Sequence, residues 1–501
     1  MSTVTITENP LALEDLLAIV DGAEVELSDG ARAVIEASRA VVDRALESKT
    51  AIYGLTTQVG HGKDTRLTEE QIRQEQMFLV MSHSGGVGPS LPTPQVRAAL
   101  TVRLNGIARG GSGASPTVAD VLATMLNAGV HPVVPEIGSV GAADLGHMAG
   151  MAQVAIGQGQ AEYQGEQLSG GEALKRAGIA PLVLSGKDGL ALISANGVSI
   201  GHAALVVARA QRAAEAADVA AALSMEATSA NPSILHPAVA RAKCIPGQAL
   251  AADHLRDLLA GSVLLQPGGA KSVQDALSFR VVPQVHGALR EYITAARDAV
   301  TTELNASDDN PLTSVPDQAM ISNGNFHPMV LAIACDALRI AIAQVGQISE
   351  RRMSHLWDGC MQQMSGQPTV PLYGLQLRYP AAALFAELKQ LAAPATLDTP
   401  TLDLGIEDHG TSAPLSARKT DTALGLLEDL LAIELMLARD MITTAPARPV
   451  FGAGTEAAFR MVEDAVTAAD PQPDAVHRAI RERFPFRPAG GFATSDRSAA
   501  R

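Results

Sequence analysis

Several glycine-containing segments of this chain carry side chains that can take part in acid–base chemistry. Tyr53, one of only five tyrosines in 501 residues, opens a Gly- and Thr-rich stretch that ends at Lys63. His83 stands just before a glycine cluster that reaches Ser90. A third segment, Gly138-Ser139-Val140-Gly141, contains no lysine and follows no predicted strand. It is therefore not a phosphate-binding loop, and its composition alone is that of an ordinary turn.

The histidines and cysteines do not have the spacing of a metal site. The three cysteines are few and odd in number, which favours a reducing cytoplasm over a disulfide scaffold. We therefore expect no metal and a cytoplasmic protein. The residues considered are His61, His83, His131, His147, Cys244, Cys335 and Cys360.

Helices are expected to position these segments. Hydrophobic residues make up 47% of the chain and aromatic residues only 3%, which favours close-packed helices over sheet sandwiches. An amphipathic helix is predicted at Ser28–Ser48, and Thr68–His83 forms another that starts with a capping box. Longer helices are predicted at Ala203–Ala227, Pro283–Thr302, Pro328–Met353, Ala381–Leu391 and Thr422–Met441.

These patterns predict a mostly α fold. A loop-bearing N-terminal domain at 1–202 is expected to stand on a long-helix bundle domain at 203–483, followed by a weakly ordered tail at 484–501. The stretch 330–348 is apolar almost all round, which is typical of a helix inside a bundle or at a subunit contact.

The net charge of −15 argues against nucleic acid and anionic membrane as partners, since no dense run of Lys and Arg occurs. Charged residues such as Asp336 and Arg339 interrupt the long apolar stretches, so no membrane span is expected. The N-terminus lacks the basic start and apolar run of a secretory signal.

The glycine segments belong to a longer series of motifs. In chain order these are YGLTT (53–57), SHSGGVG (82–88), HPVVPEIGSVGA (131–142), KDGLAL (187–192), VQD (273–275), SFR (278–280), PQV (283–285), NASDDNP (305–311), GNFH (324–327), SERR (349–352) and EDH (407–409). Together, from Tyr53 to Lys419, they resemble the aromatic amino acid ammonia-lyases, and histidine ammonia-lyase in particular. The resemblance implies a helical fold and a homotetramer whose active sites each take residues from three subunits. It also implies a small-molecule substrate, usually an aromatic amino acid that loses ammonia.

The chain departs from the family where the prosthetic group is made. The family cyclises an internal Ala-Ser-Gly to 4-methylideneimidazol-5-one, whose exocyclic methylene arises by loss of the serine hydroxyl. Here Gly141 is followed by Ala142-Ala143-Asp144, which is one residue shorter and contains no serine. Ser139 is the nearest serine, but Val140 follows it where ring closure needs a glycine. We therefore expect no methylideneimidazolone and no other cofactor.

An enzyme without this electrophile needs a substrate whose nitrogen already leaves well, because ammonia leaves poorly while a weakly acidic Cβ–H is removed. A trimethylammonium group meets this need, since it has a fixed positive charge and no lone pair for the electrophile to capture. The combination resembles ergothionase, a superfamily member that releases trimethylamine from ergothioneine, in mechanism and missing group rather than residue by residue. We thus predict a carbon–nitrogen lyase for an aromatic, histidine-derived betaine.

The resemblance also implies roles for individual residues. Tyr53 matches the base that takes the β-proton, Arg280 the arginine that holds the substrate carboxylate, and His83 the contact to the substrate ring. The pKa of a tyrosine, ordinarily about 10, must be lowered for such a role by nearby cations or donors, for which Lys63 and Arg280 are candidates. Without the resemblance, they would be a packed loop tyrosine, a buried ion-pair arginine and a satisfied helix-end histidine.

Further positions in the motifs have two interpretations each. Glu407 matches the carboxylate that faces the substrate amine or imidazole, but it could also cap a helix. Phe326 faces the ring or the cation, or it belongs to the core. Either Asn196 or Ser194 takes the place of the family's amide. Leu277 stands where the family has a catalytic tyrosine, which weakens the expectation of ammonia elimination.

Lys63, His61 and Arg378 have no firm counterpart in the family pattern. They could be new polar groups in a substrate pocket, with Lys63 the candidate for substrate binding, although exposed surface is the usual place for such residues.

Two other functions stay open. One is a histidine or tyrosine ammonia-lyase, or an aminomutase, that makes its electrophile elsewhere and is lighter by two waters. The other is a non-catalytic binding homologue that keeps the tetramer, against which the presence of Tyr53 and Arg280 argues.

Overall fold

The computed structural model describes residues 2–48, 50–364, 371–468 and 472–483. Helices dominate these residues, so the prediction of a mostly α fold is confirmed. The N-terminal elements are β1 (Thr3–Ile6), α1 (Leu13–Val20), β2 (Glu24–Leu27), α2 (Asp29–Glu47), η1 (Gly60–Gly62), α3 (Glu69–His83), β3 (Val87–Ser90), α4 (Thr93–Ala108), α5 (Pro116–Ala128), β4 (His131–Pro132), β5 (Pro135–Ile137), α6 (Leu145–Ala155), β6 (Gln160–Tyr163), β7 (Glu166–Ser169), α7 (Gly170–Arg176) and α8 (Asp188–Ile193). The following elements are α9 (Gly197–Thr228), η2 (Pro232–Leu235), α10 (Pro237–Lys243), α11 (Pro246–Leu258), η3 (Val263–Leu265), α12 (Leu277–Arg280), α13 (Val282–Leu304), β8 (Leu312–Ser314), β9 (Ala319–Ile321), α14 (Met329–Gln363), η4 (Leu375–Leu377), α15 (Arg378–Leu391), η5 (Asp403–Gly405), α16 (Ala413–Thr444), α17 (Ala453–Ala468) and α18 (Pro473–Arg483).

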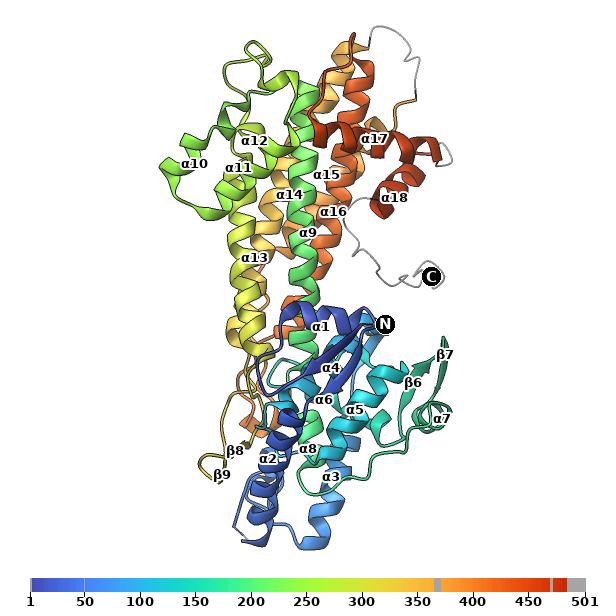
Figure 1. The fold of residues 1–501 in the computed structure, drawn as a ribbon, viewed down its shortest axis with the longest axis vertical. Coiled ribbons are helices and arrows are strands. Elements are labelled where there is room, and N and C mark those ends of the chain that lie inside the picture. The colour runs from blue at the N-terminus through green and yellow to red at the C-terminus, as the bar shows by residue number, and fades with distance from the viewer. Residues whose placement is uncertain (1, 49, 365–370, 469–471, 484–501) are drawn as a thin grey trace.

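A bundle of long helices forms the upper part of the molecule in Figure 1. Helices α9, α13, α14 and α16 pack on one another along much of their length. The buried side of α9 is rich in alanines such as Ala210, Ala213 and Ala217. Alanine favours the helical conformation, and its short side chain lets neighbouring helices come close.

A buried ion pair ties three of these helices together. Arg352 of α14 donates to both carboxylate oxygens of Glu434 on α16, at 2.6 and 2.9 Å. Ser224 of α9 and Ser349 of α14 donate to the same carboxylate, at 2.7 and 2.6 Å. These bonds satisfy a carboxylate that has no access to water, and a buried charge needs such partners.

The predicted helices form, with some shifts of their ends. Ser28 caps α2 by accepting a bond from the amide of Ala31, and the capping box of α3 is present at Thr68 and Gln71. The long helices reach further than the sequence pattern predicted: α9 begins at Gly197, α14 continues to Gln363, and α16 begins at Ala413. Tertiary packing extends these helices beyond the residues with clear apolar periodicity.

The lower part of the molecule combines shorter helices with small sheets (Figure 1). Strands β1 and β2 are parallel, whereas β3–β5, β4–β6–β7 and β8–β9 are antiparallel. The residues at 131–137 contribute the short strands β4 and β5. The boundary proposed after residue 202 falls inside α9, and one hydrophobic core runs from Ile6 to Ile480. The proposed tail at 484–501 lies outside the described residues.

The apolar stretch 330–348 has two different sides in α14. Leu338, Ile342 and Val345 are fully buried, whereas Val330 and Ile333 are 70% and 51% exposed.

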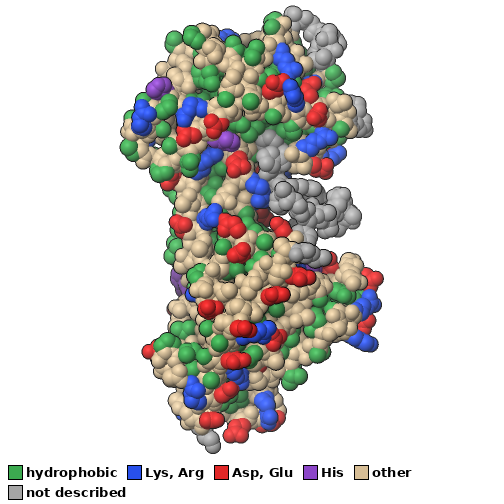
Figure 2. All heavy atoms as spheres, viewed as in Figure 1, with side chains coloured by type: hydrophobic (Ala, Val, Ile, Leu, Met, Phe, Trp, Pro, Cys, Tyr) green, Lys and Arg blue, Asp and Glu red, His purple; other side chains and the backbone are tan. Residues whose placement is uncertain are grey.

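Two helical stretches, Asp188–Thr228 and Met329–Gln363, are long and apolar enough to cross a membrane, with 94% and 61% of the most apolar window buried in the protein. Buried core helices have the same hydropathy. Figure 2 shows acidic and basic side chains scattered over one face without a continuous basic region.

Candidate active site

A cavity of about 500 Å³ opens among α3, α8 and several loops. Its wall comes from parts of the chain that are far apart in sequence: one face of α3, the loop that follows Ile52, the residues before α6, the end of α8, the segment before α14 and the turn around η5. The wall includes Tyr53, His61, Glu75, Phe78, His83, Ala142, Ala143, Ser194, Phe326, Asp403 and Glu407. The fold therefore brings most of the residues singled out in the sequence into one place.

Helix α3 supplies a row of wall residues. Its capping box fixes the first turn, and Glu75, Leu79 and His83 follow at intervals of four residues on the cavity side. The ring Nδ1 of His83 lies 2.9 Å from the carbonyl oxygen of Leu79. Because a carbonyl only accepts, Nδ1 carries a proton, and in the neutral tautomer that has this proton Nε2 is an acceptor for a ligand.

Helix α8 is anchored by a buried carboxylate from the KDGL motif. Asp188 accepts bonds from the amide and hydroxyl of Ser115, at 2.8 and 3.0 Å, and from the amide and hydroxyl of Ser185, at 2.9 and 2.6 Å. This anchor places Leu190 and Ile193 in the cavity wall. The motif thus has a structural role next to the site.

Tyr53 lies in a tight turn in which the amides of residues 55, 56 and 57 all donate to the carbonyl of Ile52. Its phenol oxygen accepts a bond of 3.0 Å from the amide of Gly60. Burial raises the pKa of Tyr53 above its ordinary value of 10; the Gly60 bond opposes this rise, and the carboxylates of Glu407 and Asp403 add to it. Within one chain, therefore, the cations expected to lower the pKa of Tyr53 are missing from its surroundings.

Lys63 does not reach the cavity. Its side chain is 47% exposed and lies 3.3 Å from the carboxylate of Asp64. The expected part of Lys63 in substrate binding therefore has no support from its place in this chain. Arg378, the other unassigned cation, is paired with Glu350 at 2.6 Å and donates to Ser354 at 2.7 Å, away from the wall.

His61 and Asp403 join the Tyr53 loop to the turn around η5. The backbone amide of His61 donates to Asp403 at 2.9 Å, and its ring Nδ1 lies 2.7 Å from the other carboxylate oxygen. Gly60, with φ +59°, lets the carboxylate approach, since a Cβ there would lie 2.3 Å from an oxygen of Asp403. The same glycine supplies the amide that binds Tyr53.

Glu407 is held at the far end of that turn. Its carbonyl accepts from the amide of Leu402 at 2.7 Å, and its amide donates back to Leu402 at 3.3 Å. Burial raises the pKa of the Glu407 carboxyl, and Asp403 adds to the rise. Two residues further on, His409 forms a ring-to-ring bond of 2.8 Å with His327, the neighbour of Phe326.

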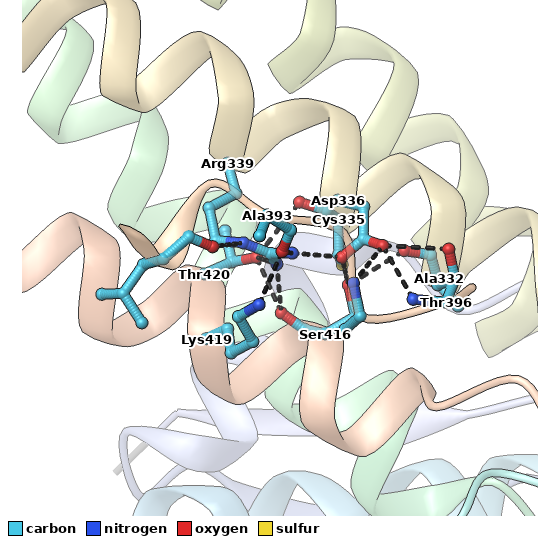
Figure 3. Close-up of polar contacts among 11 residues, drawn as sticks. Ala332, Cys335, Asp336, Arg339, Ala393, Thr396, Ser416, Lys419 and Thr420 are labelled. Atoms are coloured by element: carbon cyan, nitrogen blue, oxygen red, sulfur yellow. Dashed lines mark hydrogen bonds and ion pairs between the residues drawn. The ribbon is translucent and has the colours of Figure 1, made fainter. Parts of the chain in front are cut away.

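A buried network fixes the segment that leads into this turn, as Figure 3 shows. On α14, Arg339 donates to the carbonyls of Leu391 and Ala393, at 2.6 and 3.1 Å, and also to Asp336. Asp336 in turn accepts from the amide and hydroxyl of Thr396, at 3.1 and 2.9 Å. Burial opposes ionisation of Asp336, but bonds from Ser416 and Arg339 outweigh it and lower its pKa. The backbone at 391–396 is thus attached to the bundle.

The loop before α6 is tightly bonded. Ser139 donates through its hydroxyl to the carbonyl of Ala143 and accepts from the amide of Gly141, both at 2.9 Å. The amide of Ala143 donates to the carbonyl of Phe326 at 2.9 Å, and the amide of Asp144 donates to Ala195 at 2.8 Å. Ala143 has φ +56°, a left-handed conformation that costs energy for a residue with a Cβ.

Ser199 holds the carboxylate of Asp144, through its amide at 2.7 Å and its hydroxyl at 2.9 Å. Burial raises the pKa of the Asp144 carboxyl. Asp144 lies behind the wall rather than in it, so its role here is to fix the start of α6.

The two candidates for the family's amide, Ser194 and Asn196, have different surroundings. Ser194 lines the cavity, and its hydroxyl accepts a bond of 3.3 Å from the amide of Asn310. Asn196 is fully buried outside the wall, and neither atom of its side-chain amide has a hydrogen-bond partner among the described residues.

Arg280 lies at the end of the molecule opposite the cavity. Helix α12 lies at the top of Figure 1, whereas α3 and α8 lie at the bottom. The 32 residues of α9 separate the two ends, a span of about 48 Å at 1.5 Å per residue. Arg352 donates to the carbonyl of Ser278 at 3.1 Å and so fixes α12 on the bundle. Arg280 therefore cannot enter the cavity of its own chain.

Residues 11–464 match the model of the aromatic amino acid lyase family. The chain belongs to this family. It is 36% identical over 479 residues to histidine ammonia-lyase of Alkaliphilus metalliredigens, with 94% of each chain covered. The ergothioneine-degrading enzyme ergothionase of Treponema denticola has a TM-score of 0.91 at 27% identity, over 97% of this chain and 99% of that chain. Tyrosine aminomutase of Streptomyces globisporus has a TM-score of 0.89 at 28% identity, over 96% and 97%.

The prosthetic group that this lyase family implies does not fit the residues present. Ala142, Ala143 and Asp144 carry no hydroxyl that could be lost. The nitrogen that would close the ring belongs to Asp144, whose amide is bonded to Ala195 and whose side chain is bonded to Ser199. Ser139 uses its hydroxyl in two bonds within the loop. No step of the chemistry is therefore assigned to a methylideneimidazolone.

Sequence reasoning missed Glu75, Phe78 and Asp403 in this lyase's cavity. Helical periodicity could have found Glu75, because it precedes Leu79 and His83 by four and eight residues. No local signal points to Asp403, which lies in a turn between two helices and contacts a residue 342 positions earlier.

Proposed function

We propose that this lyase eliminates an amine, trimethylamine, from an aromatic, histidine-derived amino acid betaine without a methylideneimidazolone group. The observation that carries the proposal is the charge of the cavity wall. It includes the carboxylates of Glu75, Asp403 and Glu407, and no lysine or arginine among its described residues. Such a wall favours a ligand with a fixed positive charge. The similarity to an ergothioneine-degrading enzyme supports the same class of substrate.

The proposed reaction is a β-elimination in which Tyr53 is the base. The Tyr53 phenolate takes a proton from Cβ, the electrons of that C–H bond form the Cα–Cβ double bond, and trimethylamine leaves with the C–N electron pair. The products are an unsaturated acid, neutral trimethylamine and a proton, which passes from Tyr53 to solvent. The Gly60 amide supports the phenolate oxygen. His83 offers Nε2 to a ring N–H, and Glu407 faces the ring or the positive charge.

A homotetramer with shared active sites completes the proposal. The Arg280 of a second subunit would hold the substrate carboxylate and supply the positive charge that lowers the pKa of Tyr53. Two observations support this assembly. Arg280 is remote from its own cavity, and apolar side chains of α13 and α14 are exposed, including Tyr292 at 46%, Val330 at 70% and Ile333 at 51%.

A screen of amine release tests the proposal. Histidine, tyrosine, phenylalanine and their trimethyl betaines are offered to the purified enzyme, and released ammonia and trimethylamine are separated by ion chromatography. Trimethylamine from hercynine or ergothioneine, with no ammonia from histidine, is expected. Ammonia from unmodified histidine alone would contradict the proposal.

Ordinary histidine ammonia-lyase activity is the second candidate, because a relative of that name is 36% identical to the chain. It requires an electrophile made at an unexpected place. Intact mass spectrometry separates the two, since cyclisation lowers the mass by two waters. Inactivation by cyanide or borohydride would also favour this candidate.

A further inference from the structure

Glu75 is a buried carboxylate for which the described residues of its own chain provide no partner. Glu75 is only 8% exposed, and it lines the cavity from the middle of α3. It makes no hydrogen bond or ion pair with any residue in the described part of the chain, and its oxygens are not among the fully buried side-chain atoms that lack a partner, so they keep some exposed surface. Buried charges in proteins are paired or neutralised, and a cation bound in the cavity would pair with this carboxylate.

The surroundings of Glu75 favour one kind of cation. Phe78 follows it by one turn on the same wall and is 57% exposed to the cavity and solvent, and Leu79 and Leu190 are apolar neighbours in the lining. A primary ammonium would need acceptors for three N–H donors. A quaternary ammonium donates no hydrogen bond and is bound by negative charge together with an aromatic face. A single carboxylate beside an aromatic ring suits the quaternary group better.

The other carboxylates of the wall have different surroundings. Asp403 already accepts two bonds from His61, at 2.9 and 2.7 Å. Glu407 and His83 both line the cavity, and burial raises the pKa of the Glu407 carboxyl. His83 is eight residues after Glu75, about 12 Å along the helix axis. A ligand with an imidazole at one end and an ammonium group at the other can therefore contact both His83 and Glu75.

We propose that Glu75, together with Phe78, binds the quaternary ammonium group of the substrate and so selects betaines over free amino acids. This inference rests on the proposed function and names the residues that determine its specificity. It assigns the ring end of the ligand to His83 and Glu407, and the cationic end to the middle of α3.

Calorimetric binding to the full-length enzyme tests the inference. Both ligands, hercynine and L-histidine, are titrated in a Tyr53→Phe background so that turnover does not interfere. Glu75→Gln keeps the shape of the side chain and removes its charge, and it is expected to weaken hercynine binding at least tenfold while histidine binding changes less than threefold. Glu69→Gln, an exposed glutamate on the same helix, is the matched control and is expected to leave both affinities unchanged.

Phe78→Leu provides a second test at an exposed position, where folding is not at risk. It is expected to weaken hercynine three- to tenfold and Phe78→Tyr to restore binding. The inference would be overturned if Glu75→Gln weakened the binding of both ligands equally. It would also be overturned if neither Glu75→Gln nor Phe78→Leu weakened the binding of hercynine. The binding results do not depend on turnover. An enzyme that releases no trimethylamine would refute the proposed function. Loss of the discrimination between hercynine and histidine in Glu75→Gln would nevertheless support the cation site.

Discussion

Asp403 accepts two hydrogen bonds from His61, one from the backbone amide at 2.9 Å and one from ring Nδ1 at 2.7 Å. The pair connects the loop of Tyr53 with the turn of Glu407, across 342 positions of the chain. Since Gly60 both touches Asp403 and donates to Tyr53, the geometry of the proposed base depends on this carboxylate.

Asp403→Ala is expected to lower kcat/KM by about tenfold or more, because each lost bond to a carboxylate contributes about 1.5–3 kcal/mol. Asp403→Asn keeps an acceptor for the His61 amide and is expected to retain more activity. Steady-state kinetics with the proposed betaine substrate checks both. The exposed Asp64→Asn on the same loop is the control, and equal losses in the two Asp403 variants would contradict the positioning role.

The pH profile of the same variants follows from the pKa of Tyr53. Burial raises this pKa most, and Glu407 and Asp403 add to the rise. The proposed mechanism requires the phenolate of Tyr53, so activity is expected to increase as pH rises through the pKa of Tyr53. Removing the charge in Asp403→Asn lowers that pKa and is expected to move the acid limb of kcat/KM to lower pH. An acid limb that stays in place would show that another group titrates.

Subunit mixing checks whether Tyr53 and Arg280 of different chains share a site. Tyr53→Phe and Arg280→Ala are each expected to be nearly inactive, since each removes one half of the site. In the proposed tetramer, random assortment of co-expressed chains would give about a quarter of the sites both native residues. Activity recovered in the purified mixture confirms sharing, whereas mixed tetramers without recovery would mean that Arg280 serves another purpose.

His131 is expected to make the free energy of unfolding depend on pH in the acid range. Burial, with a smaller effect of Arg97, lowers the pKa of His131 from 6.5 to about 4. Protonation therefore favours the unfolded chain, and the stability present above pH 6.5 is lost as pH falls toward 4. The shift amounts to about 3 kcal/mol. His131→Gln is expected to reduce the fall in melting temperature between pH 7 and pH 4.5. His236→Gln, at an exposed position, is not expected to reduce it.

Arg339→Met separates the buried pair in Figure 3 and leaves Asp336 without its guanidinium. Removing one partner of a buried ion pair costs about 3–5 kcal/mol. The melting temperature is expected to fall, and kcat/KM with it, because residues 391–396 lead to the turn of Asp403 and Glu407. The double variant Arg339→Met/Asp336→Leu is expected to recover part of the stability. Lys419→Met, which removes only one bond to Ala393, is the milder comparison.

The sequence by itself determined where the main helices form and that the residues needed to make the prosthetic group are absent. The caps of α2 at Ser28 and of α3 at Thr68 were readable because a capping bond joins residues three positions apart. The absence of a hydroxyl between Ala142 and Asp144 is a covalent fact that no fold can change. The motifs from Tyr53 to Glu407 likewise indicated the family and most of the cavity wall.

Only the tertiary structure decided which side chains meet. It placed Arg280 at the far end of the bundle from Tyr53, left the carboxylate of Glu75 without a partner among the described residues, and joined Asp403 to His61. Local periodicity carries information over a few turns of helix, whereas these relationships depend on how helices hundreds of residues apart pack together. Their partners therefore become identifiable only when the whole chain is folded.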